Sequence, residues 1–157
     1  MLFQLGRSLG ESGLVLSAAN HYDELHRTAV EYLGVEHPAT LLARGNASRW
    51  RAEIVDSAEL FAESVRLLSV QTRVLGPEHP ITLITRNNLA GRMGAVGDVA
   101  RAVAEYDDLL AIRLRTQGPD HPDTLSIRSN WLYWRATTGE PVGPELESLL
   151  ADSLRVL

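Results

Sequence analysis

The fold of this chain is decided by a stretch of fifteen residues, 76–90, which reads GPEHPITLITRNNLA. The same pattern stands at 34–48 as GVEHPATLLARGNAS and at 118–132 as GPDHPDTLSIRSNWL. The interval from Gly34 to Gly76 is the same as that from Gly76 to Gly118, and each copy carries Gly, His, Pro, Thr, Leu, Arg and Asn at the same positions. We call this interval the repeat period. A pattern that returns at a fixed period of about 20–50 residues is the sequence signature of a stacked array.

Each unit of the repeat is expected to form two helices, an A helix followed by a B helix. Gly and the Pro after it end the preceding B helix, and the Pro of His-Pro suits the first turn of an A helix because it has no N–H to leave unpaired. Asp56 and Asp98 are expected to cap the B helices. We expect A helices at about 38–53, 80–95 and 122–138, and B helices at about 57–75, 99–117 and 144–157.

Residues 1–33 are most of a further unit, because Gly13 and Tyr22 stand two repeat periods before Gly97 and Tyr106. We expect its helices at about 2–11 and 14–33. The expected organisation is a single array of a partial repeat, 1–33, and three repeats, 34–75, 76–117 and 118–157. The array is expected to continue in a longer parent protein.

The pattern resembles the tetratricopeptide repeat, in the 42-residue form of kinesin light chain and of many bacterial regulatory proteins. The resemblance rests on the His-Pro pattern, on Asn87-Asn88-Leu89-Ala90, and on Gly97-Asp98 between the helices. It implies an all-α fold, a right-handed superhelical solenoid of antiparallel helix pairs, with a concave groove for a peptide or protein. Val55 departs from the pattern because it replaces the Gly between the helices.

Composition narrows the functions further. The net charge is −5, which argues against a nucleic-acid partner because phosphate binding needs a basic face. No run of apolar residues is long enough for a membrane span. The chain has no Cys and no signal-peptide pattern, so a cytoplasmic location is expected. All fifteen basic residues are Arg, which suggests a GC-rich, bacterial genome.

The candidate binding site is a stripe along the A helices. Positions spaced i, i+4, i+7 share one helix face, and in the related family this face lines the groove and its Asn grips the ligand backbone. An Asn amide has donors and an acceptor for a passing peptide bond. The alternative is that these Asn residues bond the neighbouring repeat and only stiffen the array. The candidate residues are Asn46, Arg49, Ile84, Asn87, Asn88, Ser126, Asn130 and Tyr133.

Three other repeated residue types have structural explanations. Arg44, Arg86 and Arg128 are expected to pair with carboxylates of an adjacent helix, for which Asp107, Asp108, Glu36 and Glu78 are available, rather than with a ligand. The repeated His residues are expected to position the A helices, since equivalent atoms of stacked repeats lie too far apart to share one metal ion. Trp50, Trp131 and Trp134 are expected to pack between helices, with an exposed Trp134 as a partner hot spot as the alternative.

No enzymatic constellation is expected. The Gly-x-Ser-x-Gly match at 6–10 lies near the end of an expected helix, whereas that motif works on a strand-to-helix turn. The sequence therefore predicts a protein-interaction scaffold without metal or cofactor. The alternative is a structural segment that self-associates through its terminal helices, for which the Leu-rich end of the last helix is the signal.

Overall fold

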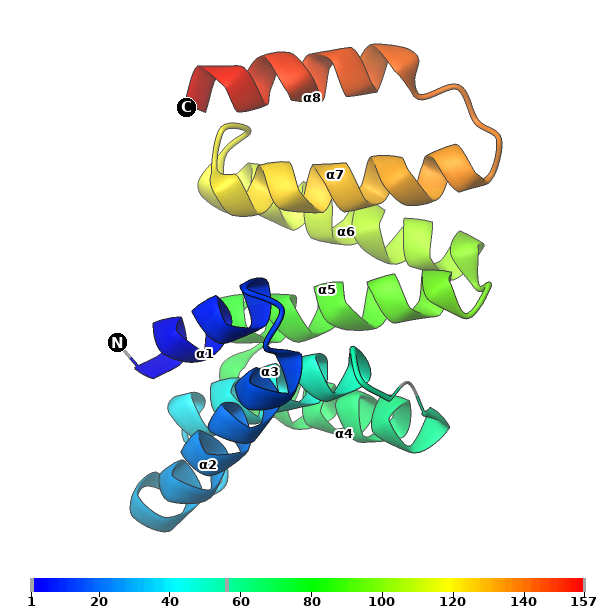
Figure 1. The fold of residues 1–157 in the computed structure, drawn as a ribbon. Coiled ribbons are helices and arrows are strands. Elements are labelled where there is room, and N and C mark those ends of the chain that lie inside the picture. Colours follow the sequence, from blue (N-terminus) through cyan, green and yellow to red (C-terminus); the bar gives the residue numbers. More distant parts are fainter. Residues whose placement is uncertain (1, 56, 157) are drawn as a thin grey trace. The chain divides into compact units, whose positions relative to one another are not determined.

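The structure is a computed structural model of the chain, and it describes residues 2–55 and 57–156. In these residues every regular element is an α-helix (Figure 1). The A helices are α1 (Leu2–Glu11), α3 (Pro38–Ala52), α5 (Pro80–Ala95) and α7 (Pro122–Thr137), and the B helices are α2 (Val15–Leu33), α4 (Ala58–Leu75), α6 (Val99–Gln117) and α8 (Gly143–Val156). The predicted all-α fold of helix pairs is confirmed, and the helix ends agree closely with the predicted ones.

The repeated His caps the A helices through its side chain, a role that the sequence analysis did not assign to it. In each of the three copies the Nδ1 atom of the His accepts a hydrogen bond from the backbone N–H two residues later. The distances are 3.2 Å for His37, 3.2 Å for His79 and 3.1 Å for His121. Each His is therefore a helix cap that satisfies one N–H of the first turn, and the following Pro lacks the N–H that would otherwise need a partner.

Glycine ends the B helices, as predicted. Gly34, Gly76 and Gly118 have φ angles of 89°, 98° and 83°, a backbone region that side chains with a Cβ rarely adopt. Each of these residues donates its N–H to the carbonyl four residues earlier, which closes the last turn of the helix.

The predicted capping of the B helices by Asp residues is not confirmed. Asp56 lies outside the described residues. Ser57 caps α4, with its hydroxyl oxygen accepting a hydrogen bond from the Leu60 N–H at 3.2 Å. Asp98 stands before α6 but its side chain makes no capping bond, so that prediction is wrong. Ser57 has the extended backbone, with φ −130° and ψ 150°, that turns a side chain toward the first turn, whereas Asp98 has φ −84° and ψ 59°.

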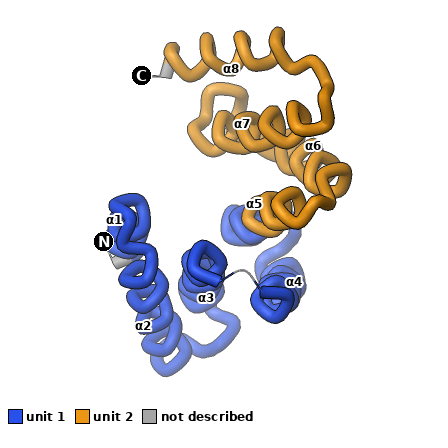
Figure 2. The backbone as a smooth tube through the Cα atoms, turned by 45° about the vertical axis from the view of Figure 1, so that its right-hand side comes forward, with its two compact units in different colours: residues 1–85 blue, residues 86–157 orange. Residues whose placement is uncertain are grey.

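The chain divides into two compact units, residues 1–85 and 86–157 (Figure 2). The first unit holds α1 to α4 and the start of α5, and the second holds the rest of α5 with α6, α7 and α8. The core of the first unit joins α2 to α3, and α1 packs against it. Its buried members are Ala18, Ala19, Tyr22, Ala47 and Trp50.

Within each unit a Trp of one A helix packs against a Gly of the preceding A helix. A Cβ placed on Gly10 would lie 2.2–2.5 Å from atoms of the Trp50 ring, and one placed on Gly94 would lie 2.6–2.7 Å from the Trp134 ring. Only glycine lets the ring approach so closely, because ordinary carbon–carbon contacts are about 3.5–4.0 Å. Gly94 stands two repeat periods after Gly10, and Trp134 stands two repeat periods after Trp50.

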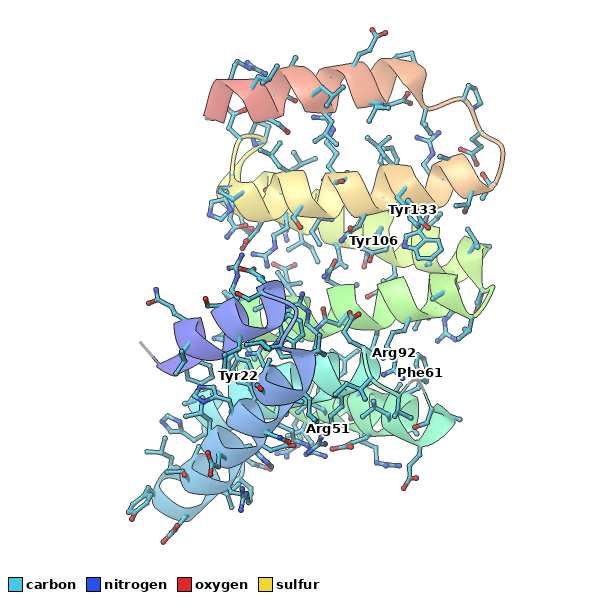
Figure 3. The ribbon with its side chains drawn as sticks, in the orientation of Figure 1. Tyr22, Arg51, Phe61, Arg92, Tyr106 and Tyr133 are labelled. Atoms are coloured by element: carbon cyan, nitrogen blue, oxygen red, sulfur yellow. The ribbon has the colours of Figure 1, made fainter. Side chains whose placement is uncertain are left out.

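A second contact also returns after two repeat periods. The Tyr22 hydroxyl donates to the carbonyl of Phe3 at 2.6 Å, and the Tyr106 hydroxyl donates to the carbonyl of Asn87 at 3.2 Å (Figure 3). Both bonds join a B helix to the A helix before it. The two compact units are therefore related copies of a double repeat, which the single-period pattern alone does not reveal.

Candidate functional site

The predicted stripe is accessible to solvent on each of the three A helices. On α3, Asn46 is half-buried and Arg49 is exposed. On α5, Ile84 is 37% exposed, and Asn87 and Asn88 are half-buried. On α7, Ser126 is exposed, Asn130 is half-buried and Tyr133 is 61% exposed. The spacing arguments therefore place these residues on faces that a partner can reach, and their role in binding stays a prediction.

The three repeated Asn residues are not equivalent in their contacts. Asn46 donates its side-chain amide to the Leu42 carbonyl of its own helix at 3.1 Å. Asn130 donates to the side-chain oxygen of Asn87 at 3.1 Å, which links α7 to α5. Asn88 makes no side-chain hydrogen bond with any residue in the described part of the chain. One Asn thus joins two repeats, as the structural interpretation expects, while Asn88 keeps its amide available and its role in binding stays a prediction.

The Asn87–Asn130 pair still has polar atoms to offer. Asn130 uses one N–H, so its amide oxygen and second N–H can bind elsewhere, and Asn87 uses only its oxygen. Tyr133 lies one helical turn after Asn130 on the same side of α7, and its ring meets that of Trp134 edge to face with centroids 4.8 Å apart. The second unit therefore carries a fixed pair of amides beside an exposed aromatic ring that is held in place.

Arg49, the one charged member of the stripe, is held by an aromatic ring. Its guanidinium lies 4.3 Å from the centroid of the Trp50 ring. A cation over an aromatic face is stabilised by the ring quadrupole. Arg49 is thus positioned on the surface without a carboxylate partner among the described ion pairs, and its charge remains available to an acidic group.

The repeated Arg residues form ion pairs between the two helices of one repeat, as predicted. Arg44 lies 3.6 Å from Glu63, Arg86 lies 2.6 Å from Glu105, and Arg128 lies 2.6 Å from Asp152. The Arg86 side chain is only 14% exposed; burial opposes its charge, but its bonds to Glu105 and Asp108 outweigh that effect and raise its pKa. Each of these Arg residues therefore joins an A helix to the B helix of the same repeat.

The predicted carboxylate partners were only partly right. Asp108 does pair with Arg86, at 3.0 Å. Asp107 instead accepts a hydrogen bond from the Trp131 ring N–H at 2.6 Å, and Glu36 pairs with Arg73. The repeated partners that the sequence analysis missed are Glu63 and Glu105, which stand at the same spacing after Arg44 and Arg86, so the signal was visible in the sequence.

The three Trp residues pack between helices, as predicted. Trp50 is 5% exposed and closes the core of the first unit against Gly10. Trp134 covers Gly94, and Trp131 spans from α7 to Asp107 of α6. Because Trp134 is half-buried, Tyr133 and not Trp134 is the aromatic side chain that α7 presents to solvent.

A polar depression of about 790 Å³ lies over α2 and the end of α3, and the sequence analysis did not identify it. Its two ion-paired members are Asp23 and Arg51, and Arg51 is also 4.0 Å from Glu63. Burial lowers the pKa of His26, and the charge of Arg44 lowers it further. The lining residues are Ser17, Asn20, His21, Asp23, Glu24, His26, Arg27 and Arg51. The depression therefore carries charged side chains of both signs.

The hydrolase-like motif is not built as a hydrolase site. Ser8 lies inside α1, and its backbone carbonyl accepts a hydrogen bond from the Ser12 hydroxyl at 2.7 Å. No strand precedes it in the described residues, so the sharp turn that exposes a nucleophile is absent from this part of the chain.

Comparison with known proteins agrees with this architecture. Residues 82–123, from α5 through α6, match the family model described as a tetratricopeptide repeat. This segment is a tetratricopeptide repeat, and the resemblance predicted from the sequence is confirmed. Repeats of this fold generally mediate contacts between proteins. No curated protein matches the chain in sequence.

Solved structures of repeat proteins have the same fold. A putative kinesin light chain from Podosopora anserina with nearly identical TPR-like repeats has a TM-score of 0.75 and 23% identity, and the match covers 99% of this chain and 75% of that one. A variant of the same protein gives 0.74 and 23%, with 99% and 74% covered. BtubC (BKLC) from P. vanneervenii has a TM-score of 0.68 and 18% identity, with 99% and 60% covered.

Among the helices of residues 2–55 and 57–156, none has both the length and the apolar content that crossing a membrane requires.

Proposed function

We propose that this chain is a protein-interaction scaffold that binds a peptide or protein partner along the stripe of its A helices. The observation that carries the proposal is the group on α5 and α7: Asn88 with an uncommitted amide, the Asn87–Asn130 pair, and the exposed ring of Tyr133. A peptide backbone has alternating donors and acceptors, and uncommitted amides on a rigid helix can bind both.

Rigidity favours this surface over the loops. Tyr133 is fixed by the ring beside it, and Asn130 is fixed by Asn87. A side chain that is already ordered loses little conformational entropy when a partner binds, whereas ordering a rotamer-rich side chain costs about 0.5–1.5 kcal/mol. An aromatic anchor beside polar groups is also the composition typical of energetically important contacts.

The cellular setting is part of the proposal. The absence of Cys suits a reducing compartment, and the exclusive use of Arg among basic residues suits a bacterial source. We propose a cytoplasmic role within a bacterial regulatory protein, with no nucleic acid, membrane, metal or cofactor in the binding event and no catalytic step.

The proposal is tested with peptides selected from a random phage-displayed library against the intact chain. Binding of a labelled selected peptide is measured by fluorescence anisotropy for the wild type, for Asn88→Ala and for Tyr133→Ala. Each substitution is expected to weaken binding by about tenfold or more, which corresponds to about 1.4 kcal/mol. Asn20→Ala, an exposed Asn on α2, is the matched control and is expected to bind as the wild type does.

Two results would count against the proposal. One is a library that yields no peptide above background. The other is a selected peptide whose affinity is lowered by Asn20→Ala but not by Asn88→Ala or Tyr133→Ala, because the partner would then lie on a B helix.

A further inference from the structure

The turn between α3 and α4 departs from the repeat pattern. Val55 stands at the position where the turns of the other repeats carry Gly13, Gly97 and Gly139. These glycines have φ angles of 82°, 96° and 83°, and no residue in the described chain other than a glycine has a positive φ. The backbone at Val55 therefore does not follow the path that the glycine turns share.

The hydrogen bonds of this turn differ as well. In the turns made of residues 12–14 and 96–98, the residue after the glycine donates its N–H to a carbonyl five residues earlier, at 2.9 Å in both cases. This bond folds the turn back onto the end of the A helix. In the turn made of residues 53–57, the Val55 N–H instead bonds the Arg51 carbonyl four residues earlier, at 2.9 Å. The longer turn therefore begins with a further helical bond and places Val55 where the others have a glycine.

A recess of about 330 Å³ lies at this turn, and much of its lining is apolar. Ile54 and Val55 are 47% and 61% exposed, and Leu60, in the first turn of α4, is 9% exposed. Sites that take a small ligand measure about 300–1,000 Å³, so a recess of this size has room for one side chain of a partner. The charged residues of the lining are Arg51, Glu59 and Glu63.

The charges around the recess leave one carboxylate without a partner. Arg51 pairs with Asp23, and Glu63 lies 3.6 Å from Arg44. Glu59 is exposed and forms no ion pair with any residue that the structure describes. It stands in the first turn of α4, where the helix dipole favours its negative charge. A cationic group at the recess would therefore find Glu59 ionised and available.

We propose that the recess binds a partner peptide segment in which an aliphatic side chain stands next to a basic one. The aliphatic side chain enters between Ile54, Val55 and Leu60, and the basic side chain pairs with Glu59. Removing apolar surface from water drives the binding, and the charge selects among partners. None of these residues belongs to the A-helix stripe, so the inference does not depend on the binding role of that stripe.

The experiment is a nuclear magnetic resonance titration of the intact chain, in which the methyl signals of Ile54, Val55 and Leu60 are followed. The probe is the tetrapeptide Gly-Leu-Arg-Gly with both ends blocked. We expect the three signals to shift and to saturate with a Kd on the order of 1 mM, as suits a few contacts. The blocked peptide Gly-Leu-Glu-Gly is expected to bind about fivefold more weakly, because its carboxylate faces that of Glu59. Gly-Ala-Arg-Gly is expected to bind more weakly by at least about as much, because it buries less apolar surface.

Substitutions separate the two parts of the site. Glu59→Gln is expected to bind the Arg and the Glu peptide equally, whereas Glu31→Gln, which removes an exposed carboxylate of α2, is the matched control and should keep the preference. Val55→Gly, which restores the residue of the other turns, is expected to lower the affinity for Gly-Leu-Arg-Gly about fivefold or more. Ile54→Ala removes apolar surface without changing that position of the turn and should act in the same direction. The dispersion of the amide signals shows that each variant is folded.

Three outcomes would overturn the proposal. If the three methyl signals show no saturable shift up to about 10 mM of Gly-Leu-Arg-Gly, the recess does not bind such a segment. Equal affinity of the wild type for the Arg and the Glu peptide, or equal loss of the preference in Glu31→Gln, shows that Glu59 does not select the partner. Shifts of the Asn88 and Tyr133 signals with the three methyl signals unmoved show that the peptide binds to the A-helix stripe and not to the recess.

Discussion

Replacing Gly10 by Ala tests whether the Trp–Gly contact decides the packing of a unit. In the interior of a helix Ala is favoured over Gly by up to about 1 kcal/mol. At Gly10 the added Cβ would lie 2.2 Å from the nearest atom of Trp50, and that ring is 5% exposed, so it has no room to withdraw. Overpacking of a core typically costs about 1–3 kcal/mol. The overpacking therefore wins, and we expect the free energy of unfolding to fall by about 1–2 kcal/mol.

Gly45 is the matched control for this substitution. It is buried in the middle of α3, but its added Cβ would meet nothing closer than the Thr85 hydroxyl at 3.4 Å, which is an ordinary contact. Gly45→Ala should therefore gain the helical preference without the clash, and we expect the free energy of unfolding to rise by up to about 1 kcal/mol. The two substitutions are chemically identical and are expected to act with opposite signs.

The assay is urea unfolding followed by tryptophan fluorescence, with the melting temperature as a second measure. For a chain of this size about 1 kcal/mol corresponds to a shift of about 2–4 °C. In a Trp50→Phe background the smaller ring leaves space, so the cost of Gly10→Ala should shrink, and a double-mutant cycle reports the difference as a coupling energy. If Gly10→Ala and Gly45→Ala change the stability in the same direction and by the same amount, the packing argument is wrong.

Three further predictions concern stability. Leu83→Ala should lower the free energy of unfolding by about 2–5 kcal/mol, because Leu83 is 2% exposed and its loss leaves a cavity, as urea unfolding would show. Arg86→Ala should destabilise by about 1–3 kcal/mol by leaving Glu105 partly buried without its partner, and Glu105→Gln combined with it should recover part of the loss, measured by the same unfolding assay. Burial raises the pKa of the Tyr106 hydroxyl from its ordinary value of 10.0 to about 12. The contribution of the neutral hydroxyl to stability is therefore complete below pH 10 and is lost as the pH rises toward 12. Tyr106→Phe should reduce this part of the alkaline fall in melting temperature.

The helices could be predicted from the sequence because their boundaries are marked by residues with strong local preferences. Pro38, Pro80 and Pro122 each begin an A helix, and glycine ends each complete B helix before them. These signals act over a short stretch of chain and need no knowledge of the rest of it. The failure at Asp98 shows the limit of such reasoning, since a capping residue type does not form the bond unless its backbone is extended.

The pairing of repeats could not be obtained from the single repeat period. Gly10 and Gly94, like the two Trp residues that cover them, return only after two periods, and a search at one period averages them with unrelated residues. The sequence also does not show which glycines the packing requires, because glycine is required here only where an aromatic ring lies against its Cα.

The candidate site was predicted as a set of equivalent residues, and its members differ in the structure. Asn130 bonds Asn87, which is not its equivalent in the repeat, while Asn46 bonds its own helix. Side-chain rotamers are set by neighbours in space, so a spacing rule predicts the face on which an Asn lies but not the bond that it makes.

The central claim, that the A-helix stripe is the binding surface, is tested most directly by nuclear magnetic resonance. A labelled chain is titrated with a peptide selected from the random library, and the side-chain amide signals of Asn20, Asn88 and Asn130 are followed. The account predicts that the signals of Asn88 and Asn130 shift with the amount of peptide bound while that of Asn20 stays in place. A shift of Asn20 with Asn88 and Asn130 unmoved would contradict it.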